Sequence, residues 1–357
     1  MIKVQQALIR YEYDDILDVA TAAIPWERLS GKTILITEAD GLIGFYLTTA
    51  LLLRNDLYNE EINVIALVTD DIKARKRFGD LLIRDDLDLA VQDTYRELKI
   101  NQRADFIICS ADNSAKYNSP VAVLDSVFSS TINVLSYAEK CMAESTLMVS
   151  DLKVYGVLHN GKDSINETDI GYLDHTDYKN CCAIGKRASE NISSCCCKQT
   201  GLSVKIARPS YIYGPVSLED DRDWAKIIAN IVRGEDILLE SDAATSSPRS
   251  FCYVTDAVEA LFTILLCGAD AYPYNISSEY SNVSIRDFAK TAVETFSDMG
   301  VKLRFSNHED ERESQRSYLG STPEILDNKR LKDLGWVGRT TLREGISRAV
   351  RIVLAQN

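Results

Sequence analysis

The sequence predicts an α/β protein built on a Rossmann-type, doubly wound parallel sheet, with a smaller C-terminal substrate-binding domain. After residue 31, short apolar and β-branched runs alternate with helix-like segments. This alternation is typical of parallel strands joined by helical crossovers. The first run, TILIT at residues 33–37, also leads through a turn with two glycines into a helical stretch. Strand, glycine turn and helix in that order favour a nucleotide-binding fold.

Five apolar runs bounded by polar turns are the expected strands of the sheet. They are KTILIT, NVIALVT, ADFIICS, STLMVS and SVKIARP, at residues 32–37, 63–69, 104–110, 145–150 and 203–209. From about residue 215 the spacing loosens. There we expect helices at 223–234, 255–267, 284–299 and 341–355, with the short strands EDILLESDA, RSFCYV and AYPYNIS among them.

The expected domain organisation has three parts. Residues 1–30, beginning MIKVQQALIRYEYDD, form an N-terminal helical extension that packs on the body. Residues 31–215 form the Rossmann-type nucleotide-binding domain. Residues 216–357 form the substrate-binding region, from which the chain can cross back to the sheet. This second region should lie over the carboxyl ends of the strands and form a cleft with them.

Composition limits the classes of partner. The 357 residues carry a formal net charge of -13, which argues against nucleic acid and anionic membranes as partners. No run looks long enough to span a membrane, and the N-terminus turns acidic too early for a secretory signal. Nine cysteines and only three histidines show no metal-type spacing, so we expect no metal site. Reduced thiols and a cytoplasmic location are therefore expected.

The first motif is Glu38-x-x-Gly41-x-x-Gly44, with Leu42 and Ile43 between the glycines. Such a loop lets a dinucleotide pyrophosphate approach the backbone at a helix N-terminus. Glu38 stands where the first glycine belongs, and a carboxylate there is bulky and repels phosphate. Two interpretations stay open: a weakened dinucleotide site, or a tight strand–helix turn that no longer binds one.

Acidic residues follow the second expected strand. Asp70 and Asp71 come directly after ALVT. A carboxylate at this point can accept hydrogen bonds from an adenosine ribose and favours NAD over NADP, and Asp70 is the better placed of the two. Two solvated turn acids preceding a helix are an equally good interpretation.

Several blocks resemble one family over the chain from about Ile24 to the C-terminus. They include VYG at 154–156, GKRASEN, VKIARPSYIYGP, RSFCYVTDAVEALFTIL and LKDLGWVGRTTLREGI. The chain resembles the extended short-chain dehydrogenase/reductases, specifically sugar-nucleotide epimerases and dehydratases of the dTDP-glucose 4,6-dehydratase and UDP-glucuronate decarboxylase type. The resemblance implies NAD(H), a nucleotide-sugar ligand, a role in surface-polysaccharide biosynthesis, and a homodimer built on helices near 123–141 and 180–199.

The resemblance also implies particular cofactor contacts. Asp93 in VQDTY would contact an adenine edge, with Thr94 beside it. Ser110 and Ala111, after the strand ADFIIC, would border the cofactor. Lys186 would contact it as well.

The active-site positions depart from the family pattern. Members use an Asn, a Ser or Thr, and a Tyr-x-x-x-Lys whose tyrosinate exchanges a proton while the nicotinamide takes a hydride. The corresponding residues here are Ser126, Asp151, Cys182 and Lys186, and only the lysine is retained. Leu152 and Lys153 replace the Asp-Glu pair that 4,6-dehydratases use.

These replacements have two chemical interpretations. In the first, Lys186 pairs with Asp151 instead of activating a phenol. In the second, Cys182 transfers the proton, since a neighbouring lysine lowers the pKa of a thiol; the nearby Asp151 opposes this. We prefer the first.

Substrate contacts are better kept. Arg249 matches the family arginine that contacts a nucleotide-sugar diphosphate, and Arg222 is a second candidate. Each arginine could instead form a surface ion pair; the phosphate contact is preferred for Arg249, and the two interpretations are equal for Arg222. Tyr211 occupies the place of a frequent Asn. Two functions remain: a sugar-nucleotide enzyme with altered chemistry, or a non-catalytic relative that binds a nucleotide or a partner as a scaffold.

Overall fold

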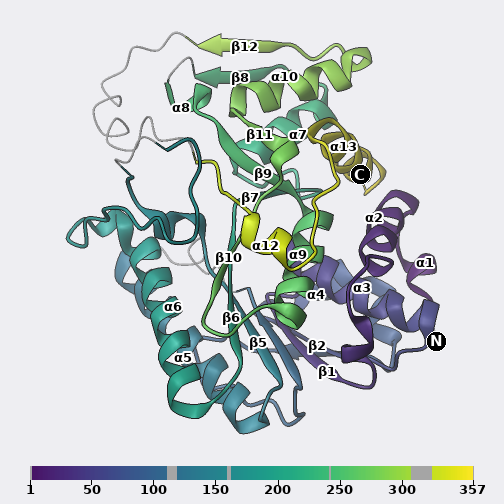
Figure 1. Ribbon diagram of the computed structural model, residues 1–357. Coiled ribbons are helices and arrows are strands. Elements are labelled where there is room, and N and C mark those ends of the chain that lie inside the picture. The colour runs from purple at the N-terminus through teal and green to yellow at the C-terminus, as the bar shows by residue number, and fades with distance from the viewer. Residues whose placement is uncertain (1, 111–118, 159–161, 241–242, 307–323, 357) are drawn as a thin grey trace.

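The computed structural model describes residues 2–110, 119–158, 162–240, 243–306 and 324–356 (Figure 1). Its centre is a seven-stranded sheet in the order β10-β6-β5-β4-β1-β2-β3, in which every neighbouring pair is parallel. The strands are β1 (Thr33–Thr37), β2 (Asn63–Val68), β3 (Leu87–Val91), β4 (Phe106–Cys109), β5 (Ser145–Val149), β6 (Val204–Pro209) and β10 (Pro273–Ile276). The predicted doubly wound fold is confirmed.

Helices cover both faces of this sheet (Figure 1). The helices of the nucleotide-binding part are α3 (Leu42–Tyr58), α4 (Asp71–Phe78), α5 (Pro120–Cys141) and α6 (Cys181–Thr200). Side chains of β1 alternate between two cores: Ile34 and Ile36 lie in the cluster with α3, and Leu35 lies in the cluster with α5. Burial on both faces explains why the strands read as continuous apolar runs.

The C-terminal region adds two small sheets. One contains β11 (Asn282–Val283), β9 (Arg249–Tyr253) and β7 (Tyr211–Tyr213), and the other contains β12 (Leu303–Ser306) and β8 (Ile237–Glu240). Its helices are α7 (Asp223–Arg233), α8 (Ala243–Ser246), α9 (Val254–Cys267), α10 (Ile285–Thr295), α12 (Lys329–Asp333) and α13 (Leu342–Gln356). Since β10 pairs with β6 and α9 packs on β5 and β6, the chain returns from this region to the large sheet.

The N-terminal extension forms two helices, not one: α1 (Val4–Ala7) and α2 (Arg10–Ala20), with extended backbone at Leu8 and Ile9. It joins the two parts of the molecule through buried Asp15. This carboxylate accepts hydrogen bonds from Tyr46 on α3 (3.1 Å) and from Tyr253 on β9 (2.5 Å), and it pairs with Arg348 on α13 (3.0 Å). Burial raises the pKa of Asp15 to about 6.

By length and composition alone, one described helix, α5, could cross a membrane. This corrects the expectation that no apolar run is long enough to do so. Half of its most apolar window (50%) is buried inside the protein. Core helices of soluble proteins have the same property, so this is weak evidence for a membrane span.

Candidate functional site

The site lies where the strand order reverses, at the carboxyl ends of β1 and β4. In open α/β sheets ligands bind in the crevice at such a point. Ser110 ties the two strands together there. Its backbone N–H donates to the Thr37 hydroxyl (3.0 Å), and its own hydroxyl donates to the Thr37 carbonyl (2.8 Å). Ser110 is thus placed beside the start of the predicted nucleotide loop. Ala111 lies outside the described residues.

The loop has the backbone of a glycine loop in spite of Glu38. Glu38 has φ +50°, a left-handed conformation that glycine adopts without strain. Its carbonyl accepts the Gly41 N–H at 2.9 Å. A Cβ on Gly44 would lie 2.3 Å from that carbonyl oxygen, so only glycine fits where α3 passes the turn. Leu42 and Ile43 form the first turn of α3, and no acidic residue lies in that turn.

Two carboxylates therefore border the pyrophosphate position. Glu38 is partly buried, and Asp40 forms an ion pair with Lys73 on α4 (3.2 Å). The backbone fits a dinucleotide, while the charge of Glu38 opposes a phosphate. The sequence did not signal that position 38 requires a positive φ; only the folded turn shows it.

Replacing Glu38 with glycine is expected to tighten NAD binding about tenfold, because it removes one negative charge beside the pyrophosphate. Stability should change little. Relief of left-handed strain is worth about 1 kcal/mol, and the extra freedom of glycine in the unfolded chain offsets roughly 0.4–1 kcal/mol of it. Calorimetric titration with NAD measures the effect.

Glu61→Gly is the matched control, since Glu61 also has a positive φ (+56°) but lies before β2, at the opposite end of the sheet. It should leave NAD affinity unchanged. Submicromolar NAD affinity in the wild-type protein would mean that the Glu38 carboxylate is turned away from the ligand.

The predicted ribose and adenine contacts lie at the ends of β2 and β3. Asp70 caps α4 by accepting the Lys73 N–H (3.0 Å), and Asp71 pairs with Arg75 one helical turn on (2.9 Å). Asp93 accepts the Tyr95 N–H (3.0 Å). Thr94 is buried and donates to Ser130 on α5 (2.9 Å), a structural role. Asp70 follows β2 and Asp93 follows β3, at the edge of the sheet where the adenosine of a dinucleotide would bind, and both remain candidates.

The four catalytic positions lie around the ends of β5 and α6. Lys186 is buried on α6, and its ammonium donates to the Val149 carbonyl at the end of β5 (3.0 Å). Asp151 follows β5 and accepts the Lys153 N–H (2.6 Å), capping the short 3-10 helix Leu152–Tyr155. The expected ion pair between Asp151 and Lys186 does not form within 4.0 Å, because each group has taken a main-chain partner.

The other two positions differ in how deeply their side chains are buried. Cys182 is half-buried in the first turn of α6, one turn before Lys186. Ser126 is fully buried on α5 and donates to the Val123 carbonyl of its own helix (2.8 Å). Beside Lys186 lies a cavity of about 10 Å³, room for about one water molecule. The Ser126 hydroxyl therefore bonds within its own helix. Along α6, Cys182 is the cysteine nearest to Lys186 in sequence.

A buried ionic network supports this end of the sheet. Glu190 on α6 binds Arg208 on β6 through two hydrogen bonds (2.9 and 2.6 Å) and accepts the Ser150 hydroxyl (2.5 Å). Arg208 also donates to the Tyr155 hydroxyl (3.1 Å) and to the Glu167 carbonyl (2.9 Å). Burial raises the pKa of Tyr155 to about 12, so this phenol stays protonated. The network therefore fixes the position of Ser150, the residue that precedes Asp151.

The substrate-side residues meet on β7 and β9. Arg249 begins β9, and its guanidinium carbon lies 5.4 Å from the centre of the Tyr211 ring. The Tyr211 hydroxyl donates to Glu324 (2.7 Å). Burial raises the pKa of Tyr211, with further contributions from Glu324 and from Asp151. Tyr211 also packs against the cluster that contains Leu152 and Tyr155, so it contacts both the predicted diphosphate-binding arginine and the turn that follows Asp151.

Arg222, the second predicted phosphate contact, already has partners. It forms two hydrogen bonds to Asp220 (2.9 and 2.6 Å), and its guanidinium carbon lies 4.5 Å from the Trp224 ring centre. A phosphate would have to break both of these bonds to Asp220. The two carboxylates near Arg249 lie 3.7 and 3.9 Å from it, beyond hydrogen-bond distance, so Arg249 is the better candidate of the two.

The comparisons with known proteins fit this geometry. Residues 34–277 match the family described as NAD dependent epimerase/dehydratase. The chain belongs to the NAD-dependent epimerase/dehydratase family. UDP-glucuronic acid decarboxylase 6 of Arabidopsis thaliana is 30% identical over 236 residues, which cover 65% of this chain and 63% of that protein. UDP-glucuronic acid decarboxylase 1 of Xenopus tropicalis is 25% identical, over 89% of this chain and 71% of that protein.

Solved structures of the epimerase/dehydratase type share the fold. An epimerase from Methanothermobacter thermautotrophicus has a TM-score of 0.76 and 17% identity, covering 96% of each chain. UDP-glucose 4-epimerase from Thermotoga maritima, solved with UDP-glucose, has a TM-score of 0.74 and 17% identity, covering 91% of this chain and 99% of that one.

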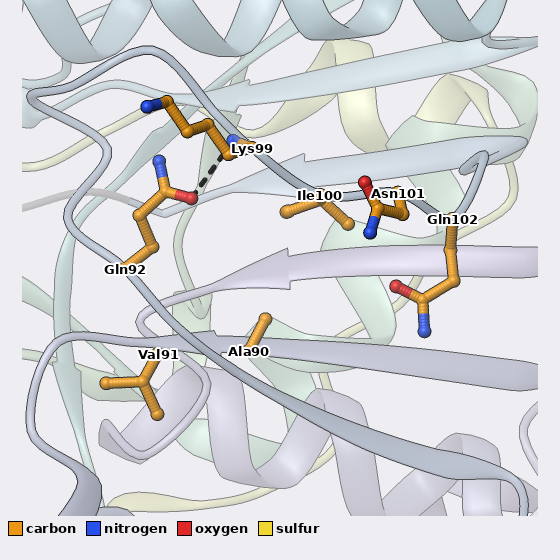
Figure 2. A pocket seen from close by; sticks show the side chains of 7 residues that line it. All are labelled: Ala90, Val91, Gln92, Lys99, Ile100, Asn101 and Gln102. Atoms are coloured by element: carbon orange, nitrogen blue, oxygen red, sulfur yellow. Dashed lines mark hydrogen bonds between the residues drawn. The ribbon is translucent and has the colours of Figure 1, made fainter.

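A second hollow, apart from the cavity beside Lys186, lies at the edge of the large sheet. Figure 2 shows it between Ala90 and Val91 on the edge strand β3 and the segment 99–102, with a volume of about 510 Å³. Its polar groups bind one another: the Lys99 N–H donates to the Gln92 side chain (3.0 Å), and Gln102 donates to Asp88 (3.0 Å). We place no site there.

In the described part of the chain, no three His, Cys, Asp or Glu side chains are grouped so that they could hold a metal ion. All nine cysteines are free thiols. Adjacent cysteines at 181–182 and 195–197 lie along one helix, α6.

Proposed function

We propose that this member of the family binds a nucleoside diphosphate sugar in the cleft between the sheet and the C-terminal region, with the usual Ser/Thr–Tyr–Lys chemistry lost or altered. We further propose a cytoplasmic role in the synthesis of surface polysaccharides. The observation that carries the proposal is the position of Tyr211, whose ring lies against Arg249 and packs on the Leu152–Tyr155 turn next to Asp151. A ligand held by Arg249 through its diphosphate would then present its sugar toward Asp151 and Lys186.

NAD(H) is the cofactor we propose for the switch point. The Gly41–Gly44 turn and the N-terminus of α3 would hold its pyrophosphate, and Asp70 and Asp93 its adenosine. Bound NAD supplies the hydride acceptor. The Lys186 ammonium, anchored on the Val149 carbonyl, would remain near the ribose as a positive charge.

Altered chemistry follows from the side chains at the acid–base positions. A serine hydroxyl donates a hydrogen bond, whereas an ionised Asp151 only accepts. A cysteine is much shorter than a tyrosine, so Cys182 would not reach the same sugar oxygen. A scaffold that binds nucleotide without turning it over is the second candidate, and the same two residues favour it.

Binding of UDP or dTDP tests the ligand. We expect calorimetry to detect one of these nucleotides, and Arg249→Ala to weaken it at least tenfold, since a guanidinium–phosphate contact is charge-assisted. Arg304→Ala is the control, because Arg304 is exposed and pairs only with Asp236 on the β8–β12 side (2.6 Å) among the contacts described. Equal loss in both variants, or no binding to the wild-type protein, would contradict the proposal.

We also propose a homodimer through α5 and α6. The outer face of α5 carries Val121, Leu124, Phe128 and Ile132 at helical spacing, with Val121 77% and Ile132 51% exposed. The most apolar window of this helix is only half buried within one chain. A second copy of the same face would cover it.

Light scattering is expected to give twice the mass of one chain at micromolar concentration. Ile132→Glu should yield monomers, because it places a charge within the apolar face. Ile83→Glu should remain dimeric, since Ile83 is as exposed (71%) but lies near β3, outside the proposed interface. A monomeric wild-type protein would refute the dimer.

A further inference from the structure

Arg249 faces two carboxylates of its own chain. Its Nε lies 3.7 Å from Glu324, and its Nη1 lies 3.9 Å from Asp223 at the start of α7. The Arg249 side chain is only 20% exposed, so water screens these charges less than at an open surface. Among the described residues, two carboxylates thus face this one guanidinium.

Glu324 is held beside Arg249 by the backbone. The two residues form a parallel bridge in which the Ser250 N–H donates to the Glu324 carbonyl (3.0 Å) and the Glu324 N–H donates to Pro248 (3.1 Å). Its side chain is held as well, because the Tyr211 hydroxyl donates to the same carboxylate oxygen that faces Arg249 (2.7 Å). Glu324 can leave Arg249 only by rotating its side chain and breaking the Tyr211 bond.

We propose that Glu324 is a built-in competitor for the anion that Arg249 binds, so that a diphosphate enters only by displacing this carboxylate. The inference rests on the proposed function and adds to it a residue that sets affinity. A diphosphate bound to Arg249 would otherwise lie within a few ångströms of the Glu324 charge, and like charges at such distances repel strongly in a partly buried site.

Tyr211 restrains the Glu324 side chain beside Arg249. It donates its hydroxyl to Glu324 and presents its ring to Arg249, so it holds the competing carboxylate in place. Removing the hydroxyl alone should free Glu324 without changing the net charge of the site. Tyr211→Phe therefore separates the position of the carboxylate from its charge.

Calorimetric titration with UDP, dTDP and inorganic pyrophosphate tests the inference on the full chain. Glu324→Gln should tighten the best of these ligands by roughly tenfold at low salt, by removing one charge near the phosphates. Added salt should reduce the gain. Tyr211→Phe should give a smaller gain of about threefold, since the charge remains but can turn away. Glu139→Gln, an equal charge change on the last turn of α5, should have no effect.

The outcomes separate this inference from the proposed function. Equal affinity in wild type, Glu324→Gln and Tyr211→Phe, with binding lost in Arg249→Ala, would overturn the inference and leave the proposed function standing. No binding of any probe to any variant would overturn the proposed function and the inference with it. If Glu324→Gln fails to fold, Glu324→Ala removes the same charge, and unchanged binding in that variant would refute the competitor role.

Discussion

The wild-type protein is expected to show no measurable 4-epimerase or 4,6-dehydratase turnover with UDP- or dTDP-sugars in the presence of NAD. Loss of one acid–base group costs about 10²–10⁴-fold in rate. Here the Ser/Thr and Tyr positions carry Asp151 and Cys182, and Lys186 donates to a main-chain carbonyl. Such losses are not additive, but together they should leave turnover below detection.

Restoring the usual pair provides the positive arm of this test. Asp151→Ser with Cys182→Tyr should raise turnover above wild type by at least tenfold, if the cofactor and sugar still bind. The same double variant with Lys186→Met should lose the gain, because the tyrosine then lacks its activating charge. Product analysis by chromatography is the measurement. Wild-type turnover at an ordinary family rate would require Cys182, Asp151 or another residue to carry the proton.

The central strands could be predicted from sequence because both of their faces are buried. Ile34, Leu35 and Ile36 are all fully buried, and they point into two different cores. The edge strand β3 is absent from the expected strands because its side chains are largely accessible. In its sequence LDLAV only Leu87 is buried. Such a strand has no continuous apolar run to mark it.

Residues of the candidate site could be proposed from sequence only where a family motif marks them. Asp151, Cys182 and Lys186 are proposed from their positions in the family pattern. The contact of Glu324 with Tyr211 spans 113 residues, and no local signal links the two. Arg208 did leave a signal, a charge within the apolar strand VKIARP, since a buried arginine requires a partner. The partner, Glu190, depends on how α6 packs and could not be read from the sequence.

Acidic residues stand at both proposed anion sites. Glu38 borders the cofactor loop, and Glu324 and Asp223 border Arg249. The whole chain carries a net charge of -13. The acidic residues at the two anion sites are more than a part of this general charge, because local backbone geometry holds each of them at one point. The two sites differ in one respect that experiments can use. The backbone fixes both residues, but the Glu324 carboxylate is also held by the Tyr211 hydroxyl. Nucleotide-sugar affinity should therefore depend on Tyr211, whereas NAD affinity should not.

Arg208→Leu is expected to destabilise the protein by about 3–5 kcal/mol, because it leaves the Glu190 carboxylate buried without its cation. Arg208 is only 5% exposed and has partners on α6, the Leu152–Tyr155 turn and the Glu167 loop. Arg233→Leu is the matched control: Arg233 pairs with Glu219 at the surface (3.1 Å), where such pairs contribute about 0–1 kcal/mol. Urea unfolding measures both free energies.

The partner residue shows whether the loss comes from an unpaired charge or from lost packing. If the unpaired Glu190 carboxylate causes the loss of stability, changing Glu190 to Leu in the Arg208→Leu protein should restore about half of the lost free energy of unfolding, since no buried charge then remains. The Ser150 hydroxyl would lose its acceptor in the double variant and keep the recovery incomplete. A double variant no more stable than Arg208→Leu would attribute the loss to the packing of Arg208 on the Tyr155 ring, which its guanidinium carbon approaches to 4.9 Å.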